Sequence, residues 1–391
     1  MTNPPLPSRR AAVAPFMAMD VLRDASALER AGRHIVHMEL GEPGVPAPAQ
    51  VRAAAQAALH AGRIGYGEAL GAPELRARIA RYYGERYGLD ASPDRVVVTT
   101  GSSGGFTLAL LAAFDPGARI AVTAPGYPAY ANILAALGLT AVSLPLGPET
   151  GFAPTAAMLA AAHRHQPLAG ALLMSPANPT GAVIPETELA AICAFCEAEG
   201  IVFISDEIYH GLEYGPRAQT ALRFSPHAIV VNSFSKYFAM TGWRLGWLIA
   251  PPTLVPPMER LQQSLAICPP TLSQKAALAA FDARDELEDI RAGYARSRAM
   301  LLARLPSLGL DAFAPPDGAF YFYIDISAFT DDSTDFCRRL LHEAGVATTP
   351  GRDFDPARGG QWLRLSYAGP GTEVAEGVER LAGWLGRTPP G

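Results

Sequence analysis

Two strong cations lie in one apolar, glycine-marked stretch of a chain that uses few charges. The stretch SFSKYFAMTGWRLGW spans residues 233–247 and contains Lys236 and Arg244. Burial or a neighbouring cation lowers the pKa of a lysine, and the free amine can then form a Schiff base with a carbonyl compound. The guanidinium of Arg244 offers a fixed fork of donors for a phosphate. A surface salt bridge would explain either cation alone, but the apolar segment that they share argues against it.

Polar residues that could contact the same ligand follow apolar segments elsewhere in the chain. Asp206 ends the apolar run of ISDEIYHG. An unpaired carboxylate there would be costly, so it should face a cation such as a protonated pyridine nitrogen, and Tyr209 could reach the same ring. Asn178 in SPANPTG precedes a proline, which holds it extended, and its amide can hydrogen-bond a ring substituent. A helix N-cap aspartate and a simple Asn-Pro turn remain alternative interpretations.

The segment TTGSSGGF, residues 99–106, is a glycine-rich turn between an expected strand and an expected helix. Backbone N–H groups at the positive end of a helix suit a phosphate, and the hydroxyls of Ser102 and Ser103 add donors beside Gly101. The segment matches neither a Walker loop nor G-x-G-x-x-G. Taken alone, it is equally consistent with a tight turn.

The elements that must position these residues alternate along the chain. Strands are expected at residues 95–100, 119–125, 140–146, 169–176, 201–209 and 228–235, and helices at 49–62, 73–88, 101–114, 128–138 and 186–200. Near-continuous Val/Ile runs between helices predict an α/β fold with a mostly parallel sheet, sandwiched by helices. Ligands bind at the carboxyl ends of such strands, where the polar residues above are expected.

The pattern becomes α+β in character after about residue 285. A helix at 283–304 is followed by a strand at 319–326, a helix at 333–345 and a strand at 361–368. We therefore predict a large cofactor-binding domain at residues 48–285. Residues 1–47, which include an N-terminal arm, and 286–391 are expected to form a smaller α+β domain.

Composition narrows the classes of function. The chain has 391 residues, 49% hydrophobic and 18% charged, with a net charge of −5 and four cysteines. An acidic balance gives no sign of nucleic-acid binding, no apolar run is long enough for a membrane span, and a cytoplasmic location with reduced thiols is expected. Cys193 and Cys196 are expected to pack within a helix, and His163 and His165 to lie in a loop. No metal site is predicted.

Taken together, the motifs resemble the class I/II pyridoxal-phosphate-dependent aminotransferases, which are fold type I enzymes of the aspartate aminotransferase superfamily. Residues 233–246 match the family's lysine signature, which reads small–x–small–Lys and then hydrophobic, glycine, Arg and glycine. The motifs SPANPTG, DEIY, PGYPAY and the glycine–serine turn occur in the family's order. The resemblance extends from GEPG at 41–44 to RLSYA at 364–368, and it implies the cofactor pyridoxal 5'-phosphate.

The resemblance implies a role for each matching residue. Lys236 resembles the lysine that forms the internal aldimine and moves the proton between Cα and C4′. Asp206 resembles the partner of the pyridine N–H, which keeps the ring an electron sink. Asn178 and Tyr209 resemble the donors to O3′, and Tyr127 the aromatic residue stacked on the ring. The implied phosphate cup consists of Gly101, Ser102, Ser103, Ser233 and Arg244.

Three further residues are implied to complete the site. Arg364 resembles the arginine that binds the substrate α-carboxylate through a bidentate fork, and Gly41 would lend its backbone N–H to the same carboxylate. A side chain at position 41 could block that approach. Tyr66 resembles the tyrosine that reaches the phosphate of the neighbouring subunit, which implies a homodimer with shared active sites.

The implied reaction moves an amino group from an L-amino acid to a 2-oxo acid by a ping-pong mechanism. A C–S β-lyase of the same fold is the alternative, because the same carbanion can expel a leaving group. A ligand sensor built on an aminotransferase-like domain is a third hypothesis. The sequence leaves the amino donor open among alanine, branched and aromatic amino acids.

Overall fold

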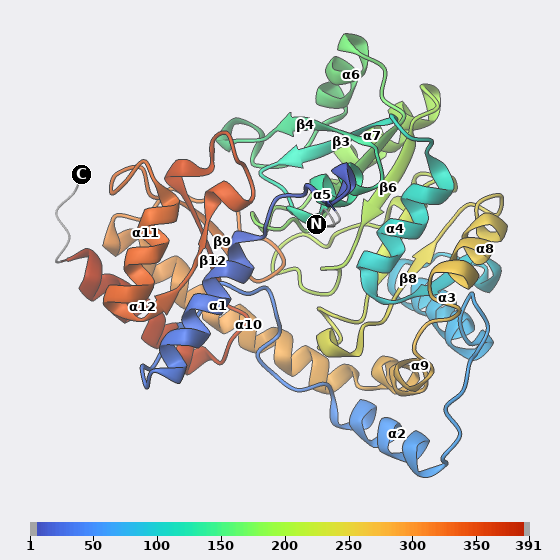
Figure 1. Ribbon diagram of the computed structural model, residues 1–391, viewed down its shortest axis with the longest axis horizontal. Coiled ribbons are helices and arrows are strands. Elements are labelled where there is room, and N and C mark those ends of the chain that lie inside the picture. Colours follow the sequence, from blue (N-terminus) through green and yellow to red (C-terminus); the bar gives the residue numbers. More distant parts are fainter. Residues whose placement is uncertain (1–5, 387–391) are drawn as a thin grey trace, which may run out of the picture.

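A seven-stranded sheet forms the centre of the protein, which is described here as a computed structural model covering residues 6–386 (Figure 1). Residues 1–5 of the expected arm lie outside the described residues. The strand order is β2-β8-β7-β6-β5-β3-β4. The bounds are β2 (Val96–Thr99), β3 (Arg119–Ala124), β4 (Thr140–Pro145), β5 (Gly170–Met174), β6 (Val202–Asp206), β7 (Ile229–Ser233) and β8 (Gly246–Ile249).

The sheet is mostly parallel, as the sequence predicts. One strand departs from this pattern: β8 pairs antiparallel with both β2 and β7. Strand β8 has only four residues and begins two positions after Arg244. We did not expect this strand from the sequence. Every residue of β2, β5, β7 and β8 is buried, which explains why these strands read as continuous apolar runs.

Helices pack around this sheet. The helices before and among its strands are α2 (Ala49–His60), α3 (Pro73–Tyr87), α4 (Gly101–Ala113), α5 (Ala129–Ala136), α6 (Ala156–His165) and α7 (Glu186–Ala198), and α8 (Val255–Leu265) and α9 (Thr271–Ala277) follow β8. Helix α4 contacts β2, β7 and β8, whereas α7 contacts β6 and α5 contacts β4. None of the helices described is long and apolar enough to cross a membrane.

The structure decides two expectations about local elements, one for a pair of histidines and one for a pair of cysteines. The prediction of a loop around His163 and His165 is wrong, because both residues lie in the last turn of α6. An alanine-rich segment forms that helix, and the Thr155 side chain caps it by accepting a hydrogen bond from Met158 N. Cys193 and Cys196 do pack inside α7, and burial raises the pKa of each thiol to about 12.

The C-terminal part forms a second, smaller group of elements beside the large sheet (Figure 1). The antiparallel sheet β11-β12-β9 consists of β9 (Tyr321–Asp325), β11 (Thr349–Pro350) and β12 (Trp362–Ser366). Its helices are α10 (Arg284–Arg304), α11 (Ser333–Arg339) and α12 (Gly371–Leu385).

Elements from the two ends of the chain lie together. Near the N-terminus, β1 (Val36–His37) pairs parallel with β10 (Val346–Ala347), and α1 (Met17–Arg30) contacts β10 and β11. The N-terminal segment therefore packs against C-terminal elements. The domain boundaries at residues 48 and 285 remain a prediction.

Candidate active site

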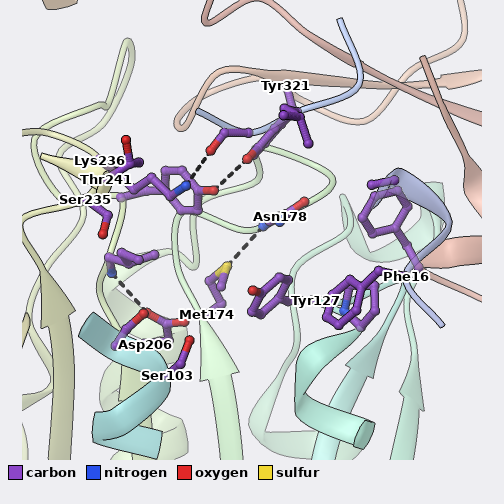
Figure 2. A pocket seen from close by; sticks show the side chains of 18 of the residues that line it. Phe16, Ser103, Tyr127, Met174, Asn178, Asp206, Ser235, Lys236, Thr241 and Tyr321 are labelled. Carbon is purple, nitrogen blue, oxygen red and sulfur yellow. Dashed lines mark hydrogen bonds between the residues drawn. The ribbon is translucent and has the colours of Figure 1, made fainter. Parts of the chain in front are cut away.

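A pocket of about 330 Å³ opens where the two groups of elements meet. Asp206 is the last residue of β6 and Met174 the last of β5, so the parallel strands bring them to the same edge of the sheet. The small sheet contributes Arg364 from β12, and the N-terminal segment contributes Phe16 and Gly41. Figure 2 shows side chains from these distant segments arranged around one space.

Most residues that the sequence singles out line this pocket. They are Gly41, Ser102, Ser103, Tyr127, Asn178, Asp206, Tyr209, Lys236, Arg244 and Arg364. Three of the predicted residues are not part of its lining: Gly101, Ser233 and Tyr66.

Lys236 lies just beyond the carboxyl end of β7, and its Nζ donates a hydrogen bond to the backbone oxygen of Gly41. The Tyr209 and Phe320 ring centroids are 5.8 and 5.9 Å from Nζ. Burial lowers the pKa of Lys236 to about 8, and the positive charge of Arg364 acts in the same direction. A substantial fraction of this lysine is therefore a free amine at moderately alkaline pH.

Asp206 is a buried carboxylate with one hydrogen bond on each oxygen. Oδ2 accepts from the Tyr130 hydroxyl at 2.5 Å, and Oδ1 accepts from Ile208 N at 3.0 Å. Burial raises the pKa of Asp206 to about 7, although both hydrogen bonds oppose this shift. Among residues 6–386 no lysine or arginine forms an ion pair with it, so a cationic ligand would supply the missing charge.

The glycine–serine turn and Arg244 meet at another side of the pocket. Gly101 opens α4 with φ +67°, and a Cβ there would come within 2.5 Å of Arg244 Nη2. Glycine is therefore required for this close approach of the guanidinium. Within the described chain no side chain caps the start of α4, where Ser102 and Ser103 lie, so its first N–H groups can donate hydrogen bonds to an anion. Arg244 remains exposed in the single chain.

The second serine of the lysine motif, rather than the first, lines the pocket. The Ser233 hydroxyl lies 2.9 Å from both Leu245 O and Ser235 Oγ and is almost fully buried. Ser235 is the residue exposed to the cavity. Sequence reasoning missed Ser235, although the small residue directly before Lys236 was part of the quoted motif.

Arg364 is buried and held in one orientation. Its Nη1 donates to Asn178 Oδ1 at 2.9 Å, and its Nη2 donates to Thr349 Oγ1 at 3.2 Å and to the Glu39 backbone oxygen. The Tyr321 and Phe354 ring centroids lie 4.6 and 4.7 Å from its Cζ. Within the described chain its Nε has no hydrogen-bond partner, which leaves a buried donor available to an anionic ligand.

Tyr321 is a further residue of the pocket lining, and it is not among the site residues predicted above from the sequence. Its hydroxyl lies 2.7 Å from the Tyr209 hydroxyl, and a Cβ added to Gly41 would collide with it. The sequence predicts that a side chain at position 41 could block the substrate carboxylate, and the structure adds that it would first collide with Tyr321 inside the protein itself. The alternation of FYFY was the available signal, because Tyr321 and Tyr323 share one face of β9.

Tyr127 faces the pocket with Phe16 and Tyr130 as ring neighbours, at centroid distances of 6.2 and 5.4 Å. Tyr130, the second tyrosine of PGYPAY, was also missed as a functional residue. Tyr66 lies away from this pocket, in the segment between α2 and α3, and it is 84% exposed.

Comparison with known proteins identifies the family. The chain matches "Aminotransferase class I and II" over residues 34–381, and it belongs to this family. A valine–pyruvate aminotransferase of Mycobacterium tuberculosis is 52% identical over 380 residues, which cover 96% of this chain and 97% of that protein. An aspartate/prephenate aminotransferase of Thermus thermophilus is 36% identical over a match that covers 97% of this chain and 99% of that protein. The crystal structure of an aminotransferase from M. tuberculosis has a TM-score of 0.95 at 51% identity, with 98% and 100% covered.

The chain is therefore a pyridoxal-phosphate-dependent aminotransferase, which transfers an amino group between an amino acid and a 2-oxo acid. The pocket fits this cofactor in three respects. Gly101 leaves room for donors beside Arg244, and Lys236 is an amine with a lowered pKa. Asp206 is a buried acid that has no cationic ion-pair partner within the part of the chain that the structure describes.

Proposed function

We propose that Lys236 binds the cofactor covalently through Nζ and that Asp206 pairs with its ring nitrogen. The supporting observation is that one pocket is faced by an amine with a lowered pKa and by a buried acid for which residues 6–386 provide no ion-pair partner. Ser102, Ser103, Ser235 and Arg244 would hold the phosphate, with Gly101 providing the space beside the guanidinium and Ser233 supporting Ser235.

The cofactor, when bound, supplies an aldehyde carbon that takes up the amino group and a ring that accepts the electron pair left at Cα. Lys236 as a free amine would accept the proton from the substrate Cα at Nζ and then donate it to the carbon that carried the aldehyde. The charge of Asp206 would keep the ring nitrogen protonated. Asn178 and Tyr209 would donate to the ring oxygen, and Tyr127 would pack against the ring face.

Arg364 is proposed to orient the substrate. Its free Nε and its fixed guanidinium plane suit the two oxygens of an α-carboxylate, and the Gly41 backbone N–H would contribute a further donor. Holding the carboxylate would fix the position of the substrate Cα relative to Lys236 Nζ.

We further propose that the amino donor has an apolar side chain and that the acceptor is a small 2-oxo acid such as pyruvate. Around the substrate end the pocket is lined by apolar side chains, namely Phe16, Ala18, Met19, Leu40 and Phe354. The relative that is 52% identical is named a valine–pyruvate aminotransferase, which supports the same class. A spectral screen of half-reactions, amino acid by amino acid, tests this choice. Faster reaction with aspartate than with valine would contradict it.

A homodimer with shared active sites is proposed as the working assembly. Ile64, Tyr66, Leu265 and Ile267 are exposed apolar residues. Their segments are tied together, since Thr271 Oγ1 donates to Gly65 O at 2.7 Å and Gly67 N donates to Cys268 Sγ. An apolar face of this kind suits a second copy, which would receive Tyr66 near its phosphate site.

Mixing two inactive variants tests the shared site. Lys236→Ala and Tyr66→Ala subunits should each be impaired, but a hybrid dimer would contain one intact site. Partial recovery of turnover after mixing supports the proposal, and no recovery despite proven subunit exchange contradicts it.

A cytoplasmic location is also proposed. The four cysteines are free thiols, which suits a reducing compartment. Cell fractionation with an antibody against the chain would test it, and recovery in the extracellular medium would contradict it.

The lysine inventory allows a direct test of the covalent site, because the chain contains only Lys236 and Lys275. We expect borohydride reduction of the holoenzyme to leave the cofactor on the peptide that contains Lys236. Lys236→Ala should lose both the adduct and turnover, whereas Lys275→Ala, the matched control, should keep both. An adduct that persists at full yield in Lys236→Ala would overturn the assignment.

A further inference from the structure

Tyr130 provides the side-chain donor to the Asp206 carboxylate. Its hydroxyl donates to Oδ2 at 2.5 Å, and the Ile208 backbone N–H donates to Oδ1 at 3.0 Å. One donor on each oxygen defines the plane of the carboxylate, and each oxygen keeps a lone pair for a further donor. Tyr130 does not line the pocket itself, so it would act on a ligand through Asp206.

The phenol of Tyr130 is held firmly in this position. The residue lies in the first turn of α5 and is only 2% exposed. Its ring packs edge-on against Phe106 at a centroid distance of 5.3 Å and against Tyr127 at 5.4 Å with an interplanar angle of 88°. The same ring therefore supports Tyr127 while its hydroxyl holds Asp206.

We propose that Tyr130 is a positioning residue of the cofactor site, which keeps Asp206 ionised and oriented and which braces Tyr127. This inference rests on the proposed role of Asp206 as the partner of the ring nitrogen. Tyr130 thus connects Asp206, the proposed partner of the cofactor's ring nitrogen, with Tyr127, the proposed partner of the cofactor's ring face. It assigns a function to the second tyrosine of PGYPAY.

The electrostatics of the pair agree with this geometry. Burial favours the neutral form of Asp206, and the Tyr130 hydrogen bond, the Ile208 N–H and the charge of Lys236 favour the ionised form. Burial and the negative charge of Asp206 raise the pKa of Tyr130 well above its ordinary value, so the phenol remains a donor. Removing the hydroxyl leaves a buried carboxylate with one donor fewer, and a neutral acid holds a protonated ring nitrogen poorly.

The variant Tyr130→Phe tests the proposal because it keeps the ring contacts and removes one hydroxyl. We expect the variant holoenzyme to lose its cofactor on dialysis, because its affinity for the cofactor should be lower than that of the wild type by about tenfold or more. A loss of this size is typical when a hydrogen bond to a charged group is removed. The turnover number should fall by a similar factor, whereas KM for the amino donor changes little. Tyr294→Phe is the matched control, since the buried Tyr294 hydroxyl has no hydrogen-bond partner within the described chain.

A double-mutant cycle separates this inference from the proposed function. If Tyr130 acts through Asp206, adding Tyr130→Phe to Asp206→Asn should change cofactor affinity by less than about twofold. A full additional loss in that background would overturn the proposal, and so would a Tyr130→Phe enzyme whose cofactor affinity and turnover match those of Tyr294→Phe. If Asp206→Asn itself left affinity and turnover unchanged, the role of Asp206 in the proposed function would fail instead.

Discussion

Asp353 Oδ1 accepts a hydrogen bond of 2.9 Å from the backbone N–H of Met17, although 336 residues separate the two in the chain. Its Oδ2 also lies 3.3 Å from Ala18 N. The residue that precedes α1 is Phe16, whose side chain cannot cap a helix, so the carboxylate of Asp353 does so instead from the short 3-10 helix Gly351–Asp353. Because Phe16, Ala18 and Asp353 itself line the pocket, this cap also fixes one wall of the proposed substrate site.

We expect Asp353→Ala to loosen the first turn of α1. The lost cap should lower the free energy of unfolding by about 1–2 kcal/mol. The apolar wall would become mobile, so KM for the amino donor should rise severalfold while cofactor affinity stays constant. Calorimetry and steady-state kinetics on the holoenzyme measure the two effects.

Asp332→Ala provides the control for that prediction. Asp332 caps α11 by accepting hydrogen bonds from Thr334 N and Asp335 N, and it does not line the pocket. It should lower stability by a comparable amount and leave KM unchanged. If both variants raised KM equally, the link between the Asp353 cap and the pocket wall would be refuted.

Arg364→Gln should impair substrate binding and spare the cofactor. The variant loses the charge and the free Nε, so we expect KM for the amino donor to rise by about one to two orders of magnitude. Cofactor affinity, measured by equilibrium dialysis, should stay within about threefold of the wild type. Arg352→Ala, an arginine outside the pocket lining, should leave KM unaffected. A normal KM in Arg364→Gln would show that another group binds the carboxylate.

The pH dependence of cofactor capture should report on Lys236. The free amine is the nucleophile, and burial lowers its pKa from 10.5 to about 8. The rate of capture by the apoenzyme should therefore rise with pH and level off above about 8. Arg364 contributes to the lowered pKa, so Arg364→Gln should move the midpoint upward. Rapid-mixing absorbance measurements across this range suffice, and a wild-type midpoint near 10.5 would be incompatible with the buried amine.

The apoenzyme should become less stable as pH rises because of Asp206. Its pKa is about 7 when folded and 3.8 as the ordinary value, so between these limits the folded state binds more protons than the unfolded state. Stability then falls with increasing pH across this window and stays low above it. At pH 8 we expect the Asp206→Asn apoenzyme to be more stable than wild type, by on the order of 3 kcal/mol, with little difference near pH 4.

Urea unfolding of both apoenzymes at the two pH values checks this stability difference. Burial, with a smaller contribution from the charge of Asp206, raises the pKa of Glu207 to about 8. Glu207 therefore adds a slope of its own in both proteins, and this slope should be smaller in the Asp206→Asn variant. A stability difference that is independent of pH would contradict the assigned titration of Asp206.

The sequence by itself determined most of the order of strands and helices, with β8, α8 and α9 among the exceptions, and also the mostly parallel sheet and the family. Continuous apolar runs predict buried strands, and the lysine signature is a local pattern that can be read without any contact. It also identified ten of the residues that line the pocket, several of which follow neighbouring parallel strands whose carboxyl ends must converge.

Only the tertiary structure decided which partners these residues meet. The choice of Ser235 over Ser233, the bond from Tyr130 to Asp206, the rings around Arg364 and the Asp353 cap on α1 are not encoded by spacing. Each joins side chains or segments whose rotamers and directions depend on how the chain packs as a whole. The bond between Tyr130 and Asp206 spans 76 residues, and the cap spans 336, so no local pattern could specify either of them.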